Sequence, residues 1–258
     1  MRHPPKRIVC LTEETVETLY LLEEQDRIVG VSGYAVRPPK VRREKPRISA
    51  FISANIPKIL DLNPDLVLAF SDLQADIVGD LIREGIEVHA FNQRDINGIL
   101  DMIYTLGAIL DVQDKAEKLV ILLRNRIENV KIEASKFRRK RVYFEEWNDP
   151  LISGIRWVSE LIEIAGGEDI FKDLSFQKAA KNRIVSEDAV VKKNPEIIFA
   201  SWCGKKVQQG VISRRKGWDS IDAISKGNIF EIKSPIILQP GPAALTDGLD
   251  AMVRFIQS

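Results

Sequence analysis

A nine-residue pattern that occurs twice, at 63–71 and at 194–202, constrains the fold of this chain more than any other feature. The first copy reads NPDLVLAFS and the second reads NPEIIFASW. In both copies an apolar helical stretch leads to the proline, which ends a helix, and a continuous apolar run follows. Such a run is typical of a parallel strand that is buried on both faces. The repeat therefore predicts two similar α/β lobes, with one doubly wound domain as the alternative.

The segments around the two copies repeat in the same order. The strands expected in the first half are 7–11, the apolar run of the first motif that ends at Phe70, and 88–91. Those expected in the second half are 141–144, the apolar run of the second motif that ends at Trp202, 229–232 and 236–238. The helices expected between them are 14–22, 76–84, 157–165 and 218–226. Strands that alternate with helices at this spacing imply parallel sheets.

A long helical segment separates the two halves. Residues 97–110 and 115–137 are apolar at helical spacing, and the second stretch contains neither glycine nor proline. At a rise of 1.5 Å per residue, such a helix spans roughly 35 Å, enough to cross from one lobe to the other. We therefore predict an N-terminal lobe at 1–112, a linking helix at 113–138 and a C-terminal lobe at 139–258. The ligand cleft is expected between the lobes, with modest opening and closing.

Charge and hydropathy exclude several classes of function. The 38 basic and 37 acidic residues give a net charge of +1, which does not indicate a nucleic-acid partner. The basic run 136–141 is interpreted as a solvated helix end. No run of about 18 apolar residues is present, so no membrane insertion is expected. No apolar leader and no early cysteine precede the first strand, which predicts a cytoplasmic location. A periplasmic location is the alternative if a leader has been removed.

Few residues in the chain suggest an enzyme. Glycine-rich phosphate loops and the Gly-x-Ser-x-Gly motif are missing. The two cysteines and two histidines lack metal-ligand spacing, so no metal and no resident cofactor is expected. Glu145 and Glu146 are neighbours on a predicted strand and point to opposite faces, so they do not form an acid/base pair. Cys203 stays open as a nucleophile, and a Cys10–Cys203 disulfide also stays open.

Aromatic and polar residues gather where the predicted strands end. Open α/β sheets bind ligands at the carboxyl ends of their strands, and aromatic rings suit broad, flat ligands. The tryptophans at 157 and 218 lie in helical patterns and are interpreted as packing residues. The predicted ligand-binding residues are Tyr34, Arg37, Phe51, Phe70, Trp147, Trp202, Cys203 and Gln239.

The order of the chain resembles the cobalamin-binding solute-binding proteins of ABC importers, in which one long helix joins two lobes. The segments that carry the resemblance are RIVGVS at 27–32, LNPDLV at 62–67, LIEIAGGEDIF at 161–171 and IVSE at 184–187. The resemblance implies a corrinoid ligand held by aromatic rings, with Phe51, Phe70 and Trp147 at such positions and 239–242 as a polar contact loop. Relatives of this type also bind siderophores or haem, for which Arg37 and Tyr34 are the candidate contacts. A corrinoid-salvage enzyme that uses Cys203 is a third alternative.

The resemblance also implies one exposed glutamate on each lobe that docks on arginines of a membrane permease. The first of these positions is occupied here by Pro57, and the second falls near Glu187 or Asp188. Proline cannot form an ion pair, so an ABC permease partner stays open. We expect a monomer with a small-molecule ligand.

Overall fold

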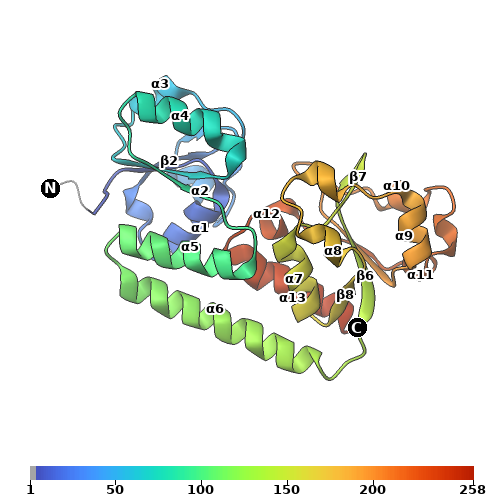
Figure 1. Ribbon diagram of the computed structural model, residues 1–258. Coiled ribbons are helices and arrows are strands. Elements are labelled where there is room, and N and C mark those ends of the chain that lie inside the picture. The colour runs from blue at the N-terminus through green and yellow to red at the C-terminus, as the bar shows by residue number, and fades with distance from the viewer. Residues whose placement is uncertain (1–3) are drawn as a thin grey trace. The chain divides into compact units, whose positions relative to one another are not determined.

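The computed structural model describes residues 4–258, which form two compact units with a five-stranded sheet in each (Figure 1). The first unit runs to Gln93 and includes Asn97–Leu123, and the second comprises Arg94–Ile96 and Arg124–Ser258. The two sheets share no strand. The prediction of two α/β lobes is therefore confirmed, and the alternative of a single doubly wound domain is wrong.

The first unit has a fully parallel sheet with the strand order β3-β2-β1-β4-β5. Its strands are β1 (Ile8–Cys10), β2 (Ile28–Ser32), β3 (Arg47–Ser49), β4 (Leu66–Phe70) and β5 (Val88–Phe91). Its helical segments are α1 (Glu13–Leu21), η1 (Gln25–Arg27), α2 (Val41–Glu44), α3 (Ile56–Leu60), η2 (Asp72–Gln74), α4 (Ala75–Arg83) and α5 (Ile96–Ile109). Helices α3 and α4 pack on one face of the sheet, and α1 lies on the other (Figure 1). Because β1 and β4 are covered on both faces, they are apolar throughout.

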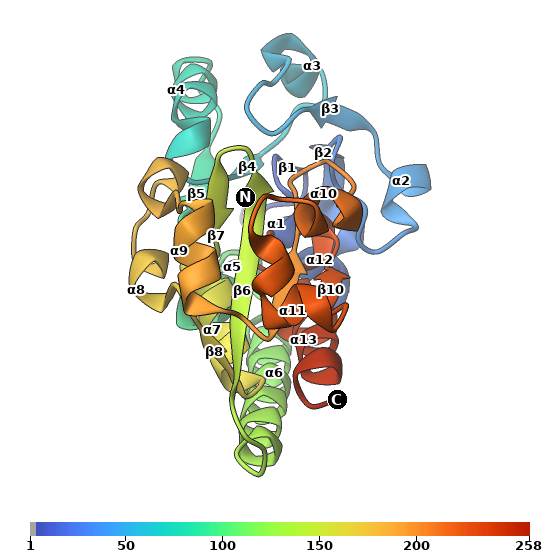
Figure 2. The same ribbon diagram turned by 90° about the vertical axis from the view of Figure 1, so that its right-hand side faces the viewer.

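The second unit has a mixed sheet with the strand order β10-β9-β6-β7. Its strands are β6 (Lys140–Asn148), β7 (Leu151–Ser153), β8 (Gly167–Asp169), β9 (Ile197–Ala200) and β10 (Ile229–Glu231). Figure 2 shows β8 beside the first part of the long strand β6 and β7 beside its last part. The helical segments that surround the sheet are α7 (Arg156–Ile164), α8 (Lys172–Ser175), η3 (Ala180–Arg183), α9 (Glu187–Lys193), α10 (Gln209–Ser213), η4 (Trp218–Ser220), α11 (Asp222–Ser225), α12 (Ser234–Ile237), η5 (Ala244–Gly248) and α13 (Leu249–Ile256). Strand β7 runs antiparallel to β6, a hairpin that the sequence pattern did not predict.

The two Asn-Pro motifs adopt the same backbone conformation. Asn63 and Asn194 both lie in the left-handed region, with φ of 44° and 42°. Asparagine tolerates this conformation better than most residues, and the proline that follows cannot continue the helix. Each motif therefore ends one segment sharply and starts a buried strand.

The acidic residue of each motif fixes the start of the neighbouring strand. Asp65 accepts a hydrogen bond from the backbone N–H of Arg7 at 2.9 Å, and Glu196 accepts one from the backbone N–H of Arg141 at 3.1 Å. The reverse backbone bonds, Asp65 N–H to Arg7 O and Glu196 N–H to Arg141 O, measure 2.9 and 2.8 Å. The repeat in the sequence is thus a repeat in hydrogen-bond geometry.

Helix α6 (Gln113–Ala134) is the 22-residue helix through which the chain passes from the first unit to the second. It packs closely on α5 at Gly107, where an added Cβ would lie 2.3 Å from Cβ of Ala116. Only glycine fits at this crossing, because any side chain would overlap the facing helix. The helix ends at Ala134, and backbone bonds of single turns continue to Phe137.

Three local expectations differ from the structure. The apolar segment 236–238, predicted as a strand, lies at the end of helix α12, whose first turn contains Pro235. Proline suits the first turn of a helix, and a short apolar run does not distinguish a strand from a buried helix. The predicted helix 218–226 is split into η4 and α11. The basic run 136–141 was interpreted as a solvated helix end, but Lys140 and Arg141 are half-buried at the start of β6, and Arg138 lies 2.6 Å from Glu196.

Candidate ligand-binding site

One buried side chain connects three strand ends of the first unit. The amide of Gln74, which is completely buried, donates to the carbonyl oxygens of Leu11 at 3.3 Å and Phe51 at 2.8 Å. Its Oε1 accepts the backbone N–H of Phe70 at 2.9 Å. The residue lies at the end of a tight turn in which Ser71 has a φ of 63°, a conformation that is costly for a non-glycine residue. Gln74 therefore fixes the backbone of Phe51 and Phe70, two of the predicted ligand contacts.

The other predicted residues of the first unit lie after strand β2. Tyr34 is 53% exposed, and its backbone N–H donates to Ser32 Oγ at 3.3 Å. The guanidinium of Arg37 forms an ion pair with Glu17 at 2.9 Å. Phe51 is half-buried, whereas Phe70 is 6% exposed and belongs to the sheet core. Of the predicted aromatic contacts in this unit, Tyr34 and Phe51 therefore have ring surface open to a ligand, and Phe70 does not.

Two carboxyl groups are buried at the start of helix α1, directly after strand β1. Glu13 and Glu14 are 6% and 1% exposed. Burial, and to a lesser extent the neighbouring carboxylates of Glu14 and Glu17, raises the pKa of Glu13 to about 8. Burial also raises the pKa of Glu14 to about 7, although its Oε1 accepts a 2.6 Å bond from the Thr12 hydroxyl. The Oε2 atoms of both residues are without a hydrogen-bond partner among residues 4–258.

Replacing Glu13 with glutamine should stabilise the protein, and increasingly so as the pH rises. The folded state retains a proton on Glu13 up to about pH 8, whereas an unfolded chain releases it near the ordinary pKa of 4.5. The free energy of unfolding therefore falls as the pH rises through this window, and glutamine removes that fall. Urea unfolding at about pH 5 and about pH 8 measures the difference in the free energy of unfolding between the variant and the wild type. Each unit by which folding raises the pKa of Glu13 contributes about 1.4 kcal/mol to that difference.

The matched control for Glu13 is Glu84→Gln, because Glu84 is exposed at the end of α4. That variant should change the free energy of unfolding by less than about 0.5 kcal/mol at either pH. If the Glu13→Gln variant has the same free energy of unfolding as the wild type at both pH values, the raised pKa of Glu13 is contradicted.

In the second unit, two tryptophans lie at the ends of β6 and β9. Trp147 is half-buried, and its indole N–H donates to Asp149 O at 2.9 Å. Trp202 is 2% exposed, and its indole N–H donates to Glu145 at 3.1 Å. Trp147 thus offers ring surface to a ligand, while the ring of Trp202 packs in the core beneath it.

The two glutamates of β6 pair with different arginines. Glu145 is fully buried and binds the guanidinium of Arg215 through two contacts of 2.5 and 2.9 Å. Glu146 makes two contacts of 2.6 and 2.8 Å with Arg183, which is 1% exposed. Each carboxylate is fully engaged in its own bidentate ion pair, which agrees with the expectation that they do not share one site.

The two cysteines occupy opposite environments and form no disulfide. Cys203 is exposed in the turn after β9. Cys10 is buried in β1, and burial raises the pKa of its thiol to about 12. Gln239 lies in the turn after α12, where its carbonyl oxygen accepts the N–H of Gly241 at 2.8 Å. Its side chain is half-buried.

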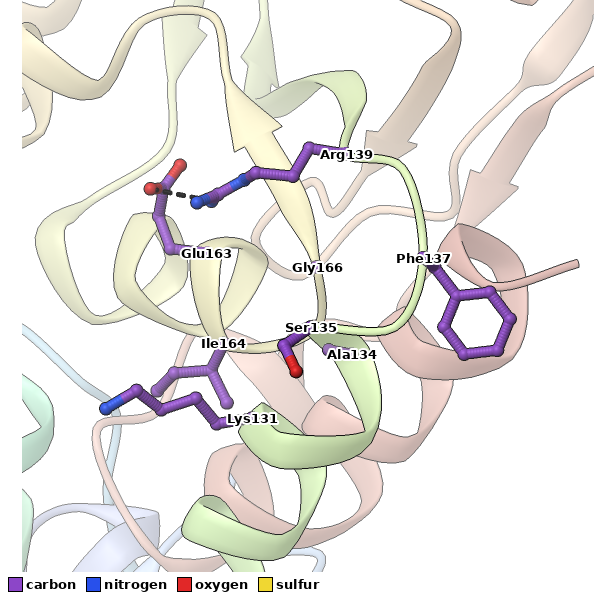
Figure 3. A pocket seen from close by; sticks show the side chains of 8 residues that line it. All are labelled: Lys131, Ala134, Ser135, Phe137, Arg139, Glu163, Ile164 and Gly166. Atoms are coloured by element: carbon purple, nitrogen blue, oxygen red, sulfur yellow. Dashed lines mark ion pairs between the residues drawn. The ribbon is translucent and has the colours of Figure 1, made fainter.

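Two cavities of the second unit lie away from these strand ends. One, of about 400 Å³, is lined by the end of α6 and by the start of β8, with Lys131, Arg139, Glu163 and Gly166 among its residues (Figure 3). Arg139 and Glu163 form an ion pair of 2.8 Å in its wall, and Phe137 is another lining residue (Figure 3). A second cavity, of about 470 Å³, shares Arg139 and Glu163. Neither cavity contains a predicted ligand-binding residue.

Within residues 4–258, no group of three or more His, Cys, Asp or Glu side chains is arranged to hold a metal ion. No helix in the same range combines the length and the apolar character needed to cross a bilayer.

Comparison with known proteins identifies the fold. The family model described as periplasmic binding protein matches residues 8–236. The chain belongs to the periplasmic binding protein family. An uncharacterized ABC transporter substrate-binding lipoprotein of Bacillus subtilis is 24% identical over 266 residues, which cover 99% of this chain and 81% of that protein.

Solved structures show the same fold for this periplasmic binding protein. The periplasmic vitamin B12-binding protein of Vibrio cholerae superimposes with a TM-score of 0.78 at 22% identity, covering 98% of this chain and 97% of that one. A periplasmic heme-binding protein from Roseiflexus superimposes with a TM-score of 0.82 at 20% identity, covering 98% and 99%. The resemblance noted in the sequence is thereby confirmed at the level of the family.

The family corrects one expectation. A cytoplasmic location was predicted because no leader precedes the first strand. That prediction is wrong, because the family consists of periplasmic binding proteins and the Bacillus relative is a lipoprotein.

The two positions implied for permease docking lie at equivalent helix starts. Pro57 is exposed in the first turn of α3, where Asn55 caps the helix by accepting Lys58 N–H at 3.0 Å. Glu187 and Asp188 are exposed in the first turn of α9, where Ser186 is the cap. The sequence did not single out Gln74, Glu13, Glu14 or Arg215. Acidic residues in the first turn of a helix are common, so Glu13 and Glu14 were not distinctive. A single glutamine or arginine in the sequence does not show which residue it will contact in the fold.

Proposed function

We propose that the protein binds a corrinoid, as the substrate-binding component of an ABC importer, and that it works outside the cytoplasm. The observation that carries the proposal is the family match over residues 8–236, together with aromatic rings at strand ends of both sheets that are exposed (Tyr34) or half-buried (Phe51 and Trp147). Relatives named as vitamin B12-binding proteins, such as that of Vibrio cholerae, support the ligand class.

The rings that support a flat ligand are Tyr34, Phe51 and Trp147. Tyr34 and Phe51 follow β2 and β3, and Trp147 lies at the end of β6. Each lies at the carboxyl end of a strand, where α/β sheets bind ligands. Because Gln74 and the Trp147–Asp149 bond fix the neighbouring backbone, Phe51 and Trp147 need little ordering on binding.

Titration with hydroxocobalamin, followed by absorbance and calorimetry, tests the proposal. We expect an affinity in the micromolar range or tighter, and a loss of roughly tenfold in Trp147→Ala, since truncating a buried aromatic contact costs more than about 1 kcal/mol. Phe176→Ala is the matched control, because Phe176 is 57% exposed but follows α8 rather than a strand. An absence of corrinoid binding removes the proposal.

Haem is the second candidate, favoured by the exposed phenol of Tyr34. A tyrosine can serve as an axial ligand of haem iron, and Tyr34 is 53% exposed at a strand end. A Tyr34→Phe variant keeps the ring and removes the ligating oxygen. If haem is the ligand, this variant should lose the charge-transfer band of a tyrosinate complex, whereas corrinoid binding should be unaffected.

The remaining alternatives have less support. An anionic siderophore would need exposed arginines at the strand ends, but Arg37 is already paired with Glu17. An enzyme that uses Cys203 would lose turnover in Cys203→Ala. With Pro57 at one docking position, we propose that a permease contact of the first unit relies on shape and not on an ion pair.

A further inference from the structure

A lysine that the sequence analysis did not assign to the site lies beside Trp147. Lys205 belongs to the loop that follows β9, and its backbone N–H donates to Trp202 O at 3.1 Å. Its Nζ lies 5.4 Å from the ring centroid of Trp147 and 5.5 Å from that of Trp202. Two indole faces thus contact one ammonium group, at distances typical of cation–π pairs.

The ammonium group of Lys205 can still bind an anion. Its one hydrogen bond goes to the neutral amide oxygen of Asn148, at 3.4 Å. Among residues 4–258 it has no carboxylate partner, unlike Arg215 in the same unit, which is neutralised by Glu145. The side chain is exposed. An ammonium has three donors, so two remain for a ligand.

We infer that Lys205 contacts an anionic group at the edge of the ligand, and that the ligand of this protein is a flat macrocycle that carries such a group. The contacts with Trp147 and Trp202 position the charge beside the ring that stacks on the ligand. Because the lysine is already ordered by two indoles, little side-chain entropy is lost when the anion binds. This inference rests on the proposed function and adds the charge of the ligand to it.

Two kinds of macrocycle carry a suitable anion. A complete corrinoid has a phosphodiester in its nucleotide loop, and haem has propionate carboxylates. The shared chemistry is an anionic oxygen beside a flat ring, which a lysine binds through charge-assisted hydrogen bonds. Matched probes without the anion exist for both: cobinamide lacks the phosphodiester, and haem dimethyl ester lacks the carboxylates.

The test compares wild type, Lys205→Met and Lys216→Met with these four probes. Methionine keeps an apolar stem over the tryptophans and removes the charge. Lys216 is exposed in the same unit, between α10 and η4, so its variant changes the net charge equally. We expect Lys205→Met to weaken binding of the anionic probe roughly 10- to 100-fold. Binding of the matching neutral probe should weaken less than about threefold. Lys205→Arg should restore binding, and Lys216→Met should bind as the wild type does.

The outcomes separate the two claims. Equal losses for the anionic and the neutral probe, or no loss in Lys205→Met, overturn the Lys205 contact, while corrinoid binding by the wild type upholds the proposed function. If the wild type binds none of the four probes, the proposed function fails and the contact fails with it. The pair of probes that binds identifies whether the anion is a phosphodiester or a carboxylate.

Discussion

Replacing Arg215 with methionine should lower the free energy of unfolding of the second unit by about 3–5 kcal/mol. Glu145 is fully buried, and Arg215 supplies both of its charged hydrogen bonds. Without the guanidinium, a carboxylate remains in the core without its charged partner, although the indole N–H of Trp202 still donates to it. An unpaired buried charge is among the most destabilising defects that one substitution can create.

Urea unfolding followed by tryptophan fluorescence measures the effect of Arg215→Met. All four tryptophans lie within residues 124–258, so the signal reports the second unit. Arg214→Met is the control, because Arg214 is exposed and should change the free energy by less than about 0.5 kcal/mol. In the double variant with Glu145→Gln, the buried charge disappears and an acceptor for Trp202 remains, so part of the loss should be recovered. Equal stabilities of the two arginine variants would argue against a buried ion pair.

The variant Gln74→Leu should destabilise the first unit by about 2–4 kcal/mol. Leucine has a similar volume but leaves the N–H of Phe70 and the carbonyl oxygens of Leu11 and Phe51 without the amide that binds them. Each buried backbone group that loses its partner costs about 1–3 kcal/mol, and relaxation of the loops offsets part of the sum.

Hydrogen exchange of the Phe70 amide follows the Gln74 effect locally, because the first unit has no tryptophan. We expect faster exchange at Phe70 and a lower melting temperature. The adjacent Leu73 is 58% exposed, so Leu73→Ala should leave both unchanged within error. Wild-type exchange at Phe70 in Gln74→Leu would show that the amide does not secure this strand end.

The predictable part of the fold comes from local backbone chemistry. Asparagine in the left-handed conformation followed by proline ends a segment in both halves, and apolar runs buried on both faces follow. These rules act within a few residues, so strands β4 and β9 and the duplication could be inferred directly. The segment 236–238 was misassigned because Ile-Ile-Leu fits a strand and a buried helix equally well.

The surroundings of the candidate ligand-binding residues were predictable only in part. Strand ends point to Tyr34, Phe51 and Trp147, but they do not show that Trp202 and Phe70 are buried while the others offer surface. Exposure depends on what covers a side chain. For Trp202 that includes Glu145, which is 57 residues away in sequence.

The sequence by itself determined two α/β lobes, their parallel core strands and the long helix between them, because the period of apolar residues and the helix-ending Asn-Pro pairs are local properties of the chain. Only the tertiary structure decided which polar groups meet: Gln74 with Leu11 across 63 residues, Arg215 with Glu145 across 70, and Lys205 with Trp147. The physical reason is that hydrogen bonds and ion pairs depend on distances of a few ångströms, which folding sets between residues that no sequence period connects.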